Sequence, residues 1–121
     1  MATKTKHDLS SPACTEGLTN LSDALYVIGG KWKLRVIIAL RGETKRFNEL
    51  QRSIPGISAR VLSNELKELE LNGFVERNVF TDGPVIVEYE LTDYSDTLST
   101  VLEALSDWGA KHRAKIKKER R

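Results

Sequence analysis

The chain has 121 residues, a length that fits one domain with a hydrophobic core of its own. Hydrophobic residues make up 40% of it and charged residues 30%, as in an ordinary globular protein, and the formal net charge of +2 is too small to indicate a polyanionic partner. The single cysteine, Cys14, excludes an internal disulfide framework and a cysteine-based zinc site, and His7 and His112 have no ligand-like spacing. We therefore expect no metal and no cofactor.

Neither a signal peptide nor a membrane span is expected. The first apolar cluster begins only near Leu18 and is too short and too interrupted for a signal peptide. No run approaches the roughly 20 apolar residues that cross a bilayer. The sequence therefore predicts a cytoplasmic protein without contact with a membrane.

Charge is distributed unevenly along the chain. Residues 31–67 hold nine basic residues against three acids, which gives this segment a net charge of +6. Residues 78–110 reverse the sign, with seven acids and no Lys or Arg. The chain is therefore electrically polarised along its length.

The predicted elements begin with a polar arm and two helices. Residues 1–16 are rich in Thr and Ser and are interrupted by Pro12, which favours a flexible N-terminal arm. A first helix should start near Leu18 and stop at Gly29-Gly30, where glycine supplies the left-handed conformation that ends a helix. A second helix, residues 32–40, carries an apolar stripe and ends at Gly42.

The next two helices predict a helix-turn-helix. The third, residues 47–54, must end before Pro55, because the residue that precedes a proline is excluded from the helical region. Residues 55–57 then supply a tight turn that contains glycine. Ser58 follows at the position where a side-chain oxygen caps a helix, so a fourth helix over 58–72 is expected.

The fourth helix has two unlike faces. At about 100° per residue, its apolar side chains gather within about 140° of arc. These are Val61, Leu62, Leu66 and Leu69. Within about 100° on the opposite side lie Arg60, Ser63, Asn64 and Lys67, without an acid among them. Arginine and lysine reach guanine acceptors, asparagine pairs with adenine, and serine permits close approach, so this face suits the reading of double-stranded DNA. The alternative is a solvated face that happens to lack acids.

The period of the pattern changes after Gly73. Residues 85–91 alternate between apolar and polar faces, and residues 74–80 are rich in β-branched and aromatic residues, so they predict two strands of a hairpin with 81–84 as their loop. A last helix, capped near Thr92 or Asp93, precedes a basic C-terminal tail over 113–121. This order predicts a mainly α protein with a small β-hairpin, in which a winged helix-turn-helix is flanked by N- and C-terminal helices.

The flanking helices are expected to form a dimer interface. In so short a chain their apolar faces are difficult to bury within one subunit, which favours pairing with a second copy across a two-fold axis. The predicted interface residues are Leu21, Leu25, Leu98, Val101, Leu102, Leu105 and Trp108.

Five motifs together resemble the HxlR-type winged helix family of bacterial transcriptional regulators, which is related to the MarR-type regulators. They are IGGKW at 28–32, RFNEL at 46–50, IPGISARVLSNELKELELNGFVER at 54–77, VEYELT at 87–92 and ALSDWG at 104–109. The resemblance implies a DNA-binding and dimerisation domain over 17–112. It also implies a dimeric, sequence-specific DNA-binding regulator, with the helix 58–72 in the major groove and the hairpin as a wing. Our leading hypothesis is therefore a homodimeric repressor that binds an inverted-repeat operator through this helix.

The candidate DNA contacts extend beyond the fourth helix. The full set is Ser58, Arg60, Ser63, Asn64, Lys67, Lys31, Lys33, Arg46 and Arg52. Lys31 or Lys33 could hold a phosphate at the start of the second helix, and ordinary surface charge is the alternative for the cations outside the fourth helix. Where the family often has a cation in the wing, this chain has Ile86, so wing contacts are expected only from Asn78, Thr81 and Gly83.

Control of the regulator has two candidate routes. The resemblance implies that Cys14 is a sensor of oxidants or electrophiles, and Lys4 and Lys6 would favour its reactive thiolate while Glu16 would oppose it. An inert thiol in the arm is the alternative. The second route is a small ligand bound in the dimer interface.

Two other classes of function were weighed against a regulator. An enzyme is not expected, because the sequence has no clustered histidines, no glycine-rich phosphate loop and no pairing of a nucleophile with a base. The acidic wing and the low net charge leave an alternative, a winged-helix protein–protein interaction module with little or no DNA binding.

Overall fold

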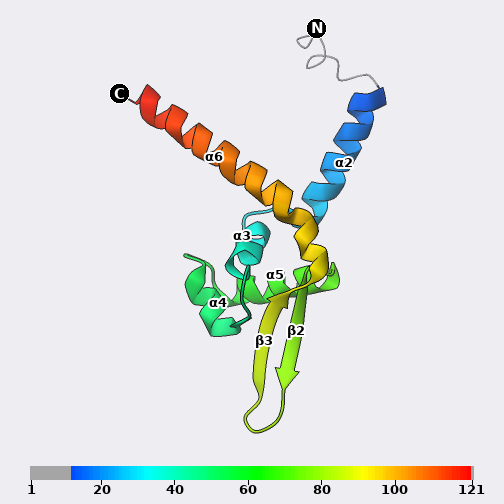
Figure 1. Cartoon of the computed structure of the whole chain (residues 1–121), viewed down its shortest axis with the longest axis vertical. Helices are drawn as coiled ribbons and strands as arrows, with labels where there is room; N and C mark the ends of the chain where they lie inside the picture. Colours follow the sequence, from blue (N-terminus) through cyan, green and yellow to red (C-terminus); the bar gives the residue numbers. More distant parts are fainter. Residues whose placement is uncertain (1–11, 121) are drawn as a thin grey trace.

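The computed structural model describes the backbone of residues 12–120 and the side chains of residues 15–120. A helical body carries a small antiparallel sheet, and two long helices extend from it (Figure 1). The elements in chain order are α2 (Pro12–Ile28), α3 (Lys33–Ala39), β1 (Lys45–Arg46), α4 (Phe47–Ser53), α5 (Ala59–Leu71), β2 (Val75–Phe80), β3 (Ile86–Leu91), the 3₁₀ helix η1 (Asp93–Leu98) and α6 (Ser99–Glu119). The prediction of a mainly α winged helix-turn-helix is confirmed.

The helix-turn-helix of α4 and α5 forms where its local signals predict it. α4 ends at Ser53, and Ile54 has extended backbone angles ahead of Pro55. Gly56 has a φ of +85°, which a residue with a side chain rarely adopts, so glycine permits the turn. The Ser58 hydroxyl accepts a hydrogen bond of 3.1 Å from the Val61 amide and caps α5 as predicted.

The sheet has one strand more than the predicted hairpin. β2 and β3 pair antiparallel, with Val75 opposite Leu91 and Phe80 opposite Ile86. β1 pairs with the other edge of β3, with Lys45 opposite Tyr89, so the strand order is β1-β3-β2. A strand of two residues shows no alternation of polar and apolar side chains, which is why the sequence analysis missed β1.

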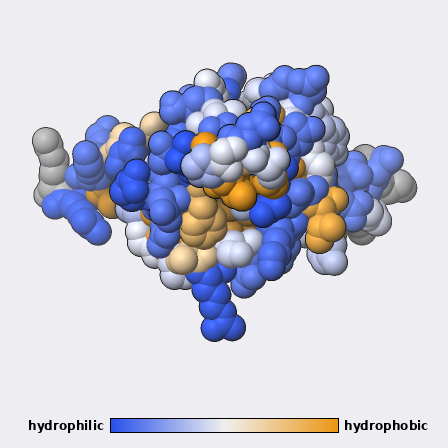
Figure 2. All heavy atoms as spheres, turned by 90° about the horizontal axis from the view of Figure 1, so that it is seen from below, coloured by the Kyte–Doolittle hydropathy of each residue, from blue (hydrophilic) through white to orange (hydrophobic). Residues whose placement is uncertain are grey.

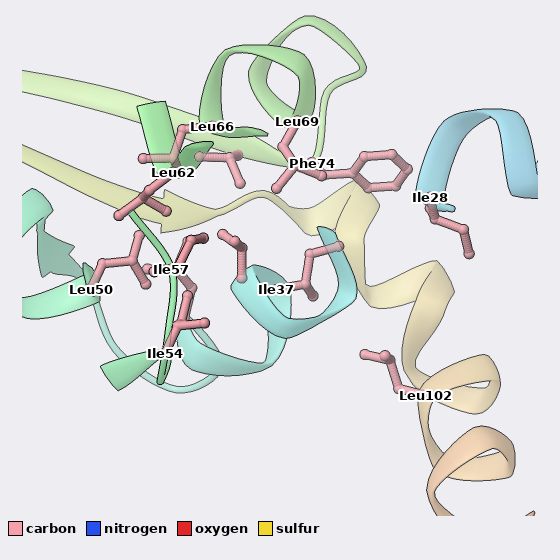
Figure 3. Packing of buried hydrophobic residues seen from close by; sticks show 13 residues of the cluster. Ile28, Ile37, Leu50, Ile54, Ile57, Leu62, Leu66, Leu69, Phe74 and Leu102 are labelled. Atoms are coloured by element: carbon pink, nitrogen blue, oxygen red, sulfur yellow. The ribbon is translucent and has the colours of Figure 1, made fainter. Parts of the chain in front are cut away.

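A single hydrophobic core holds α3, α4, α5 and the sheet together. From the hairpin end the surface is mostly hydrophilic with small apolar patches (Figure 2), whereas the buried apolar side chains converge between the elements (Figure 3). The predicted inner face of α5 supplies Leu62, Leu66 and Leu69, all buried, with Val61 packed beside them. Burial of each such side chain contributes about 1.5 to 3 kcal/mol.

The flanking helices begin and end differently from the prediction. α2 starts at Pro12, so residues 12–16 of the predicted arm are helical, and residues 1–11 lie outside the described part of the chain. The last helix is preceded by η1, and the Thr92 hydroxyl donates to the Gly73 carbonyl at 2.5 Å instead of capping a helix. α6 continues to Glu119, so most of the predicted basic tail is helical. Among the described helices, none is both long and apolar enough to cross a membrane.

Candidate nucleic-acid interface

The polar stripe of α5 lies opposite the buried leucines and is open to solvent. Arg60, Asn64 and Lys67 are exposed, and Ser63 is half-buried. Within residues 15–120, the structure gives these four side chains no hydrogen bond and no ion pair. Their donors and acceptors are therefore available to a ligand, whereas the Ser58 hydroxyl is already used as the cap of α5.

Lys33 lies away from this stripe and is held by two carboxylates. Its Nζ is 2.8 Å from Oε1 of Glu65 and 2.7 Å from Oε1 of Glu68, and its side chain is only 13% exposed. The hydrogen bond to Glu65, followed by that to Glu68, raises the pKa of the Lys33 ammonium above its usual value. This differs from the predicted role of Lys33 as a phosphate contact, because the ammonium ties α3 to α5.

Lys31 and Arg35 lie on the ring of Trp32 at the start of α3. The Lys31 ammonium is 4.7 Å from the ring centroid and the Arg35 guanidinium carbon is 5.6 Å from it. Arg35 Nη1 also donates a hydrogen bond of 2.6 Å to the Lys31 carbonyl. Both cations are exposed, so the ring orders their side chains without neutralising their charge.

Arg46 and Arg52 are exposed at opposite ends of α4. Arg46 immediately precedes α4, and its backbone amide donates to the Glu49 carboxylate at 2.9 Å. Arg46 is paired with Glu88 in the β1–β3 ladder, so an acidic residue stands opposite it. Arg52 is in the last turn of α4 and has no ion-pair partner in residues 15–120.

The predicted wing contacts are divided between the strands and the tip. The Asn78 amide donates a hydrogen bond of 3.2 Å to Glu90 across the hairpin, so its side chain is already occupied. Thr81 and Gly83 are exposed in the loop, and Gly83 has a φ of +92°. The tip therefore offers a hydroxyl and backbone amides.

The charges of the wing separate onto its two faces. Directly paired residues of an antiparallel ladder share a face, and faces alternate along a strand. Arg77 pairs with Tyr89 and shares the inner face with the buried Val75. The acids Glu76, Glu88 and Glu90 stand on the outer face. Net charge along the stretch from Asn78 onward leaves out Arg77 and does not separate the two faces, so it did not predict that the inner face carries a cation and no acid.

A groove separates α5 from the hairpin and borders the polar stripe. Its volume is about 410 Å³. Its lining residues are Ser63, Leu66, Lys67, Glu70, Arg77 and Tyr89. Ser63 and Lys67 thus belong both to the stripe and to the wall of the groove.

The apolar residues predicted for a dimer interface are mostly exposed on α2 and α6. Leu21, Leu25, Leu105 and Trp108 each leave half or more of their surface uncovered, and Val101 is exposed as well. Leu102 differs from the prediction, because it is 5% exposed and belongs to the core, with Leu98 packed against that core. Cys14 is in the first turn of α2, but its side chain lies outside the described residues.

Comparison with known proteins identifies the family. The model of HxlR-like helix-turn-helix proteins matches residues 27–117. The HTH-type transcriptional regulator BH0655 of Halalkalibacterium halodurans is 49% identical over 90 residues, which cover 73% of this chain and 79% of that protein. The crystal structure of the HTH-type regulator YtcD is similar with a TM-score of 0.74 and 40% identity, over 78% of this chain and 96% of that one. The redox regulator HypR in its reduced form has a TM-score of 0.75 and 37% identity, over 82% of this chain and 98% of that one. The chain belongs to the HxlR-like helix-turn-helix family of transcriptional regulators, which are not enzymes.

Proposed function

We propose that this regulator is a cytoplasmic, homodimeric repressor that binds an inverted-repeat operator in double-stranded DNA. The observation that carries the proposal is the polar stripe of α5, which is exposed, free of acids and without internal partners among the described residues. An α-helix with such a face fits the major groove, and the second helix of a helix-turn-helix is the element that enters it.

The proposed DNA contacts, in the stripe and around it, divide into residues that read bases and residues that bind the DNA backbone. Arg60 and Asn64 have the donor and acceptor patterns that match guanine and adenine edges, and Ser63 keeps the helix close to the bases. Lys67, Lys31 and Arg52 are cations suited to phosphates. Arg46, Thr81 and the backbone of Gly83 would contact the flanking backbone. Lys33 is left out because its ammonium is paired within the protein.

Dimerisation is supported by the two extended helices. α2 and α6 leave contiguous turns of apolar surface uncovered, with Leu21 and Leu25 on one helix and Leu105 and Trp108 on the other. A second copy that covers these faces across a two-fold axis would set two α5 helices about 34 Å apart, in successive major grooves.

A selection of bound genomic fragments tests the proposal. The purified protein is expected to enrich a common inverted repeat and to bind it with an affinity that falls steeply as salt rises, because phosphate contacts release counterions. Failure to find a duplex bound with salt-dependent affinity would contradict the proposal and favour the interaction-module alternative, in which the acidic outer face of the wing contacts a protein.

Thiol control through Cys14 is the first candidate for regulation. The structures of the redox regulator HypR in its reduced and oxidised forms have TM-scores of 0.75 and 0.71 to this chain. A thiol oxidant is expected to lower the operator affinity of the wild type but not of Cys14→Ser. An oxidant response that survives in Cys14→Ser would remove the thiol from the proposal.

A small ligand is the second candidate. A cavity of about 320 Å³ lies where α3, β3, η1 and α6 meet, with Arg41, Glu90 and Asp93 in its wall. This position joins the DNA-binding body to the helix proposed for dimerisation. A ligand bound there would act on the angle between the two.

A further inference from the structure

We propose that Arg77, at the base of the wing, binds a phosphate of the DNA backbone together with Lys67 in the groove between α5 and the hairpin. This inference rests on the proposed binding of DNA through α5. It gives the wing a cation at its base, although the stretch from Asn78 to Ala110 contains none.

The register of the hairpin fixes the face on which Arg77 stands. Arg77 is directly opposite Tyr89 and two residues after the buried Val75, so it shares their side of the sheet. Glu76, in contrast, stands opposite Glu90 on the other side. The acids of the strands therefore do not cancel the charge of Arg77 in the groove.

The groove brings two cations beside the base-reading surface. Lys67 of α5 and Arg77 of β2 line it with a single acid, Glu70. Within residues 15–120 none of these three side chains is in an ion pair. Both cations are exposed, so an incoming phosphate would displace solvent rather than an internal partner.

The geometry matches the course of a DNA strand. When α5 lies in the major groove with Arg60 and Asn64 on the bases, the strand beside it passes along the Ser63 and Lys67 side of the helix, where the groove opens. A guanidinium presents two parallel N–H donors that match phosphate oxygens. Ser63 and Tyr89 also line the groove, and both carry hydroxyls, which are donors of the kind that contact the DNA backbone.

Salt dependence of operator binding provides the first test. We expect Arg77→Gln to reduce the slope of log K against log salt by about one unit for each bound subunit, with equal losses on the operator and on random duplex. Arg77→Lys keeps the charge and should keep the slope. Arg113→Gln removes the same charge from an exposed position on α6 and should leave the slope at its wild-type value. A wild-type slope in folded Arg77→Gln would overturn the inference.

Duplexes with single methylphosphonates locate the contact. Each carries one uncharged linkage, and the position is moved along the backbone of the half-site. At one position we expect the uncharged linkage to lower the affinity of the wild type. The same linkage should not lower the affinity of Arg77→Gln or Lys67→Gln any further, because these variants already lack a cation that contacts that phosphate. If the affinity loss at each linkage position is the same for the wild type and the variants, the inference is overturned. Lys67→Gln alone provides this test if Arg77→Gln folds poorly.

The two proposals fail in different ways. If the wild type binds no duplex with salt-dependent affinity, the proposed function and this inference both fall. If the wild type binds its operator and responds to Arg60→Ala while Arg77→Gln behaves as wild type, only this inference falls.

Discussion

Lys33 connects α3 to α5 through Glu65 and Glu68 while its own side chain is largely shielded from water. Glu65 is 20% exposed and Glu68 58%, so the first ion pair is the better protected of the two. Removal of the ammonium would leave two neighbouring carboxylates of α5 without their shared partner. Such a loss is more costly than the loss of an ordinary surface pair.

We expect Lys33→Met to lower the free energy of unfolding by about 1 to 3 kcal/mol, measured by urea titration. Lys67→Met is the matched control, because its ammonium has no ion-pair partner in residues 15–120 and its loss should change stability by less than about 0.5 kcal/mol. Equal effects of the two substitutions would contradict the structural role of Lys33.

The pH dependence of this pair has a definite sign. The pKa of Lys33 is raised in the folded protein, so its stabilising contribution is complete below the usual lysine pKa of about 10.4 and is lost as pH rises through the folded-state value. The stability difference between the wild type and Lys33→Met should be constant up to about pH 10 and shrink above it. A difference that grows in alkali would contradict the assignment.

Under the proposed function, Arg60 and Asn64 contact base edges, whereas the surrounding cations contact phosphates. We expect Arg60→Ala and Asn64→Ala to weaken operator binding by about 1 to 3 kcal/mol with a smaller effect on random duplex. Arg52→Ala should weaken both equally, because a phosphate contact carries no sequence information. Fluorescence anisotropy with the two duplexes distinguishes these patterns, and equal losses for all three variants would refute the division of roles.

At the scale of elements, the sequence predicts what local signals determine. The turn at Gly56, the cap at Ser58, the β-branched and aromatic composition of β2 and the alternation of β3 depend on neighbouring residues, so the positions of these elements follow from the chain itself. β1 and the Lys33 ion pairs depend on segments that meet only after folding, which no local pattern encodes. The side of the sheet on which Arg77 stands is an intermediate case. It can be predicted from the sequence only when the register of the hairpin is known.

The cap of α5 gives a prediction at this scale. Ser58→Ala removes the acceptor for the Val61 amide and is expected to cost about 1 kcal/mol of stability in thermal or urea unfolding. Ser58→Asp supplies another acceptor at the same position and should retain wild-type stability. A similar loss in both variants would mean that the cap contributes little.

At the scale of the whole molecule, α2 and α6 extend from the body with apolar faces uncovered (Figure 1). Of the predicted interface residues, Leu102 belongs to the core, because its side of α6 faces α3 and the sheet. Sequence periodicity alone does not distinguish an apolar side of a helix that faces the core from one that faces a partner. The remaining apolar residues of α2 and α6 leave much of their surface exposed, which supports the proposed dimer.

We expect Leu105→Glu to raise the dimer dissociation constant at least tenfold, or about 1.4 kcal/mol, because it would bury a charge in an apolar interface. Leu71→Glu, on the exposed end of α5, is the matched control and should leave the oligomeric state unchanged. Sedimentation across a concentration series measures both. A dimer that tolerates Leu105→Glu would argue against an interface on this face of α6.

The pairing of β1 with β3 also has a consequence for the order of folding. α4, α5 and β2 lie between the two strands in the chain, so their ladder closes a loop through the entire helix-turn-helix, whereas β2 and β3 are adjacent. Long loops lose more entropy on closure, and contacts that close them form late. Pulse-labelled hydrogen exchange should therefore show the β3 amides that bond to β1 gaining protection after the β3 amides that bond to β2, so that Arg46 reaches its final position only when the rest of the body has formed.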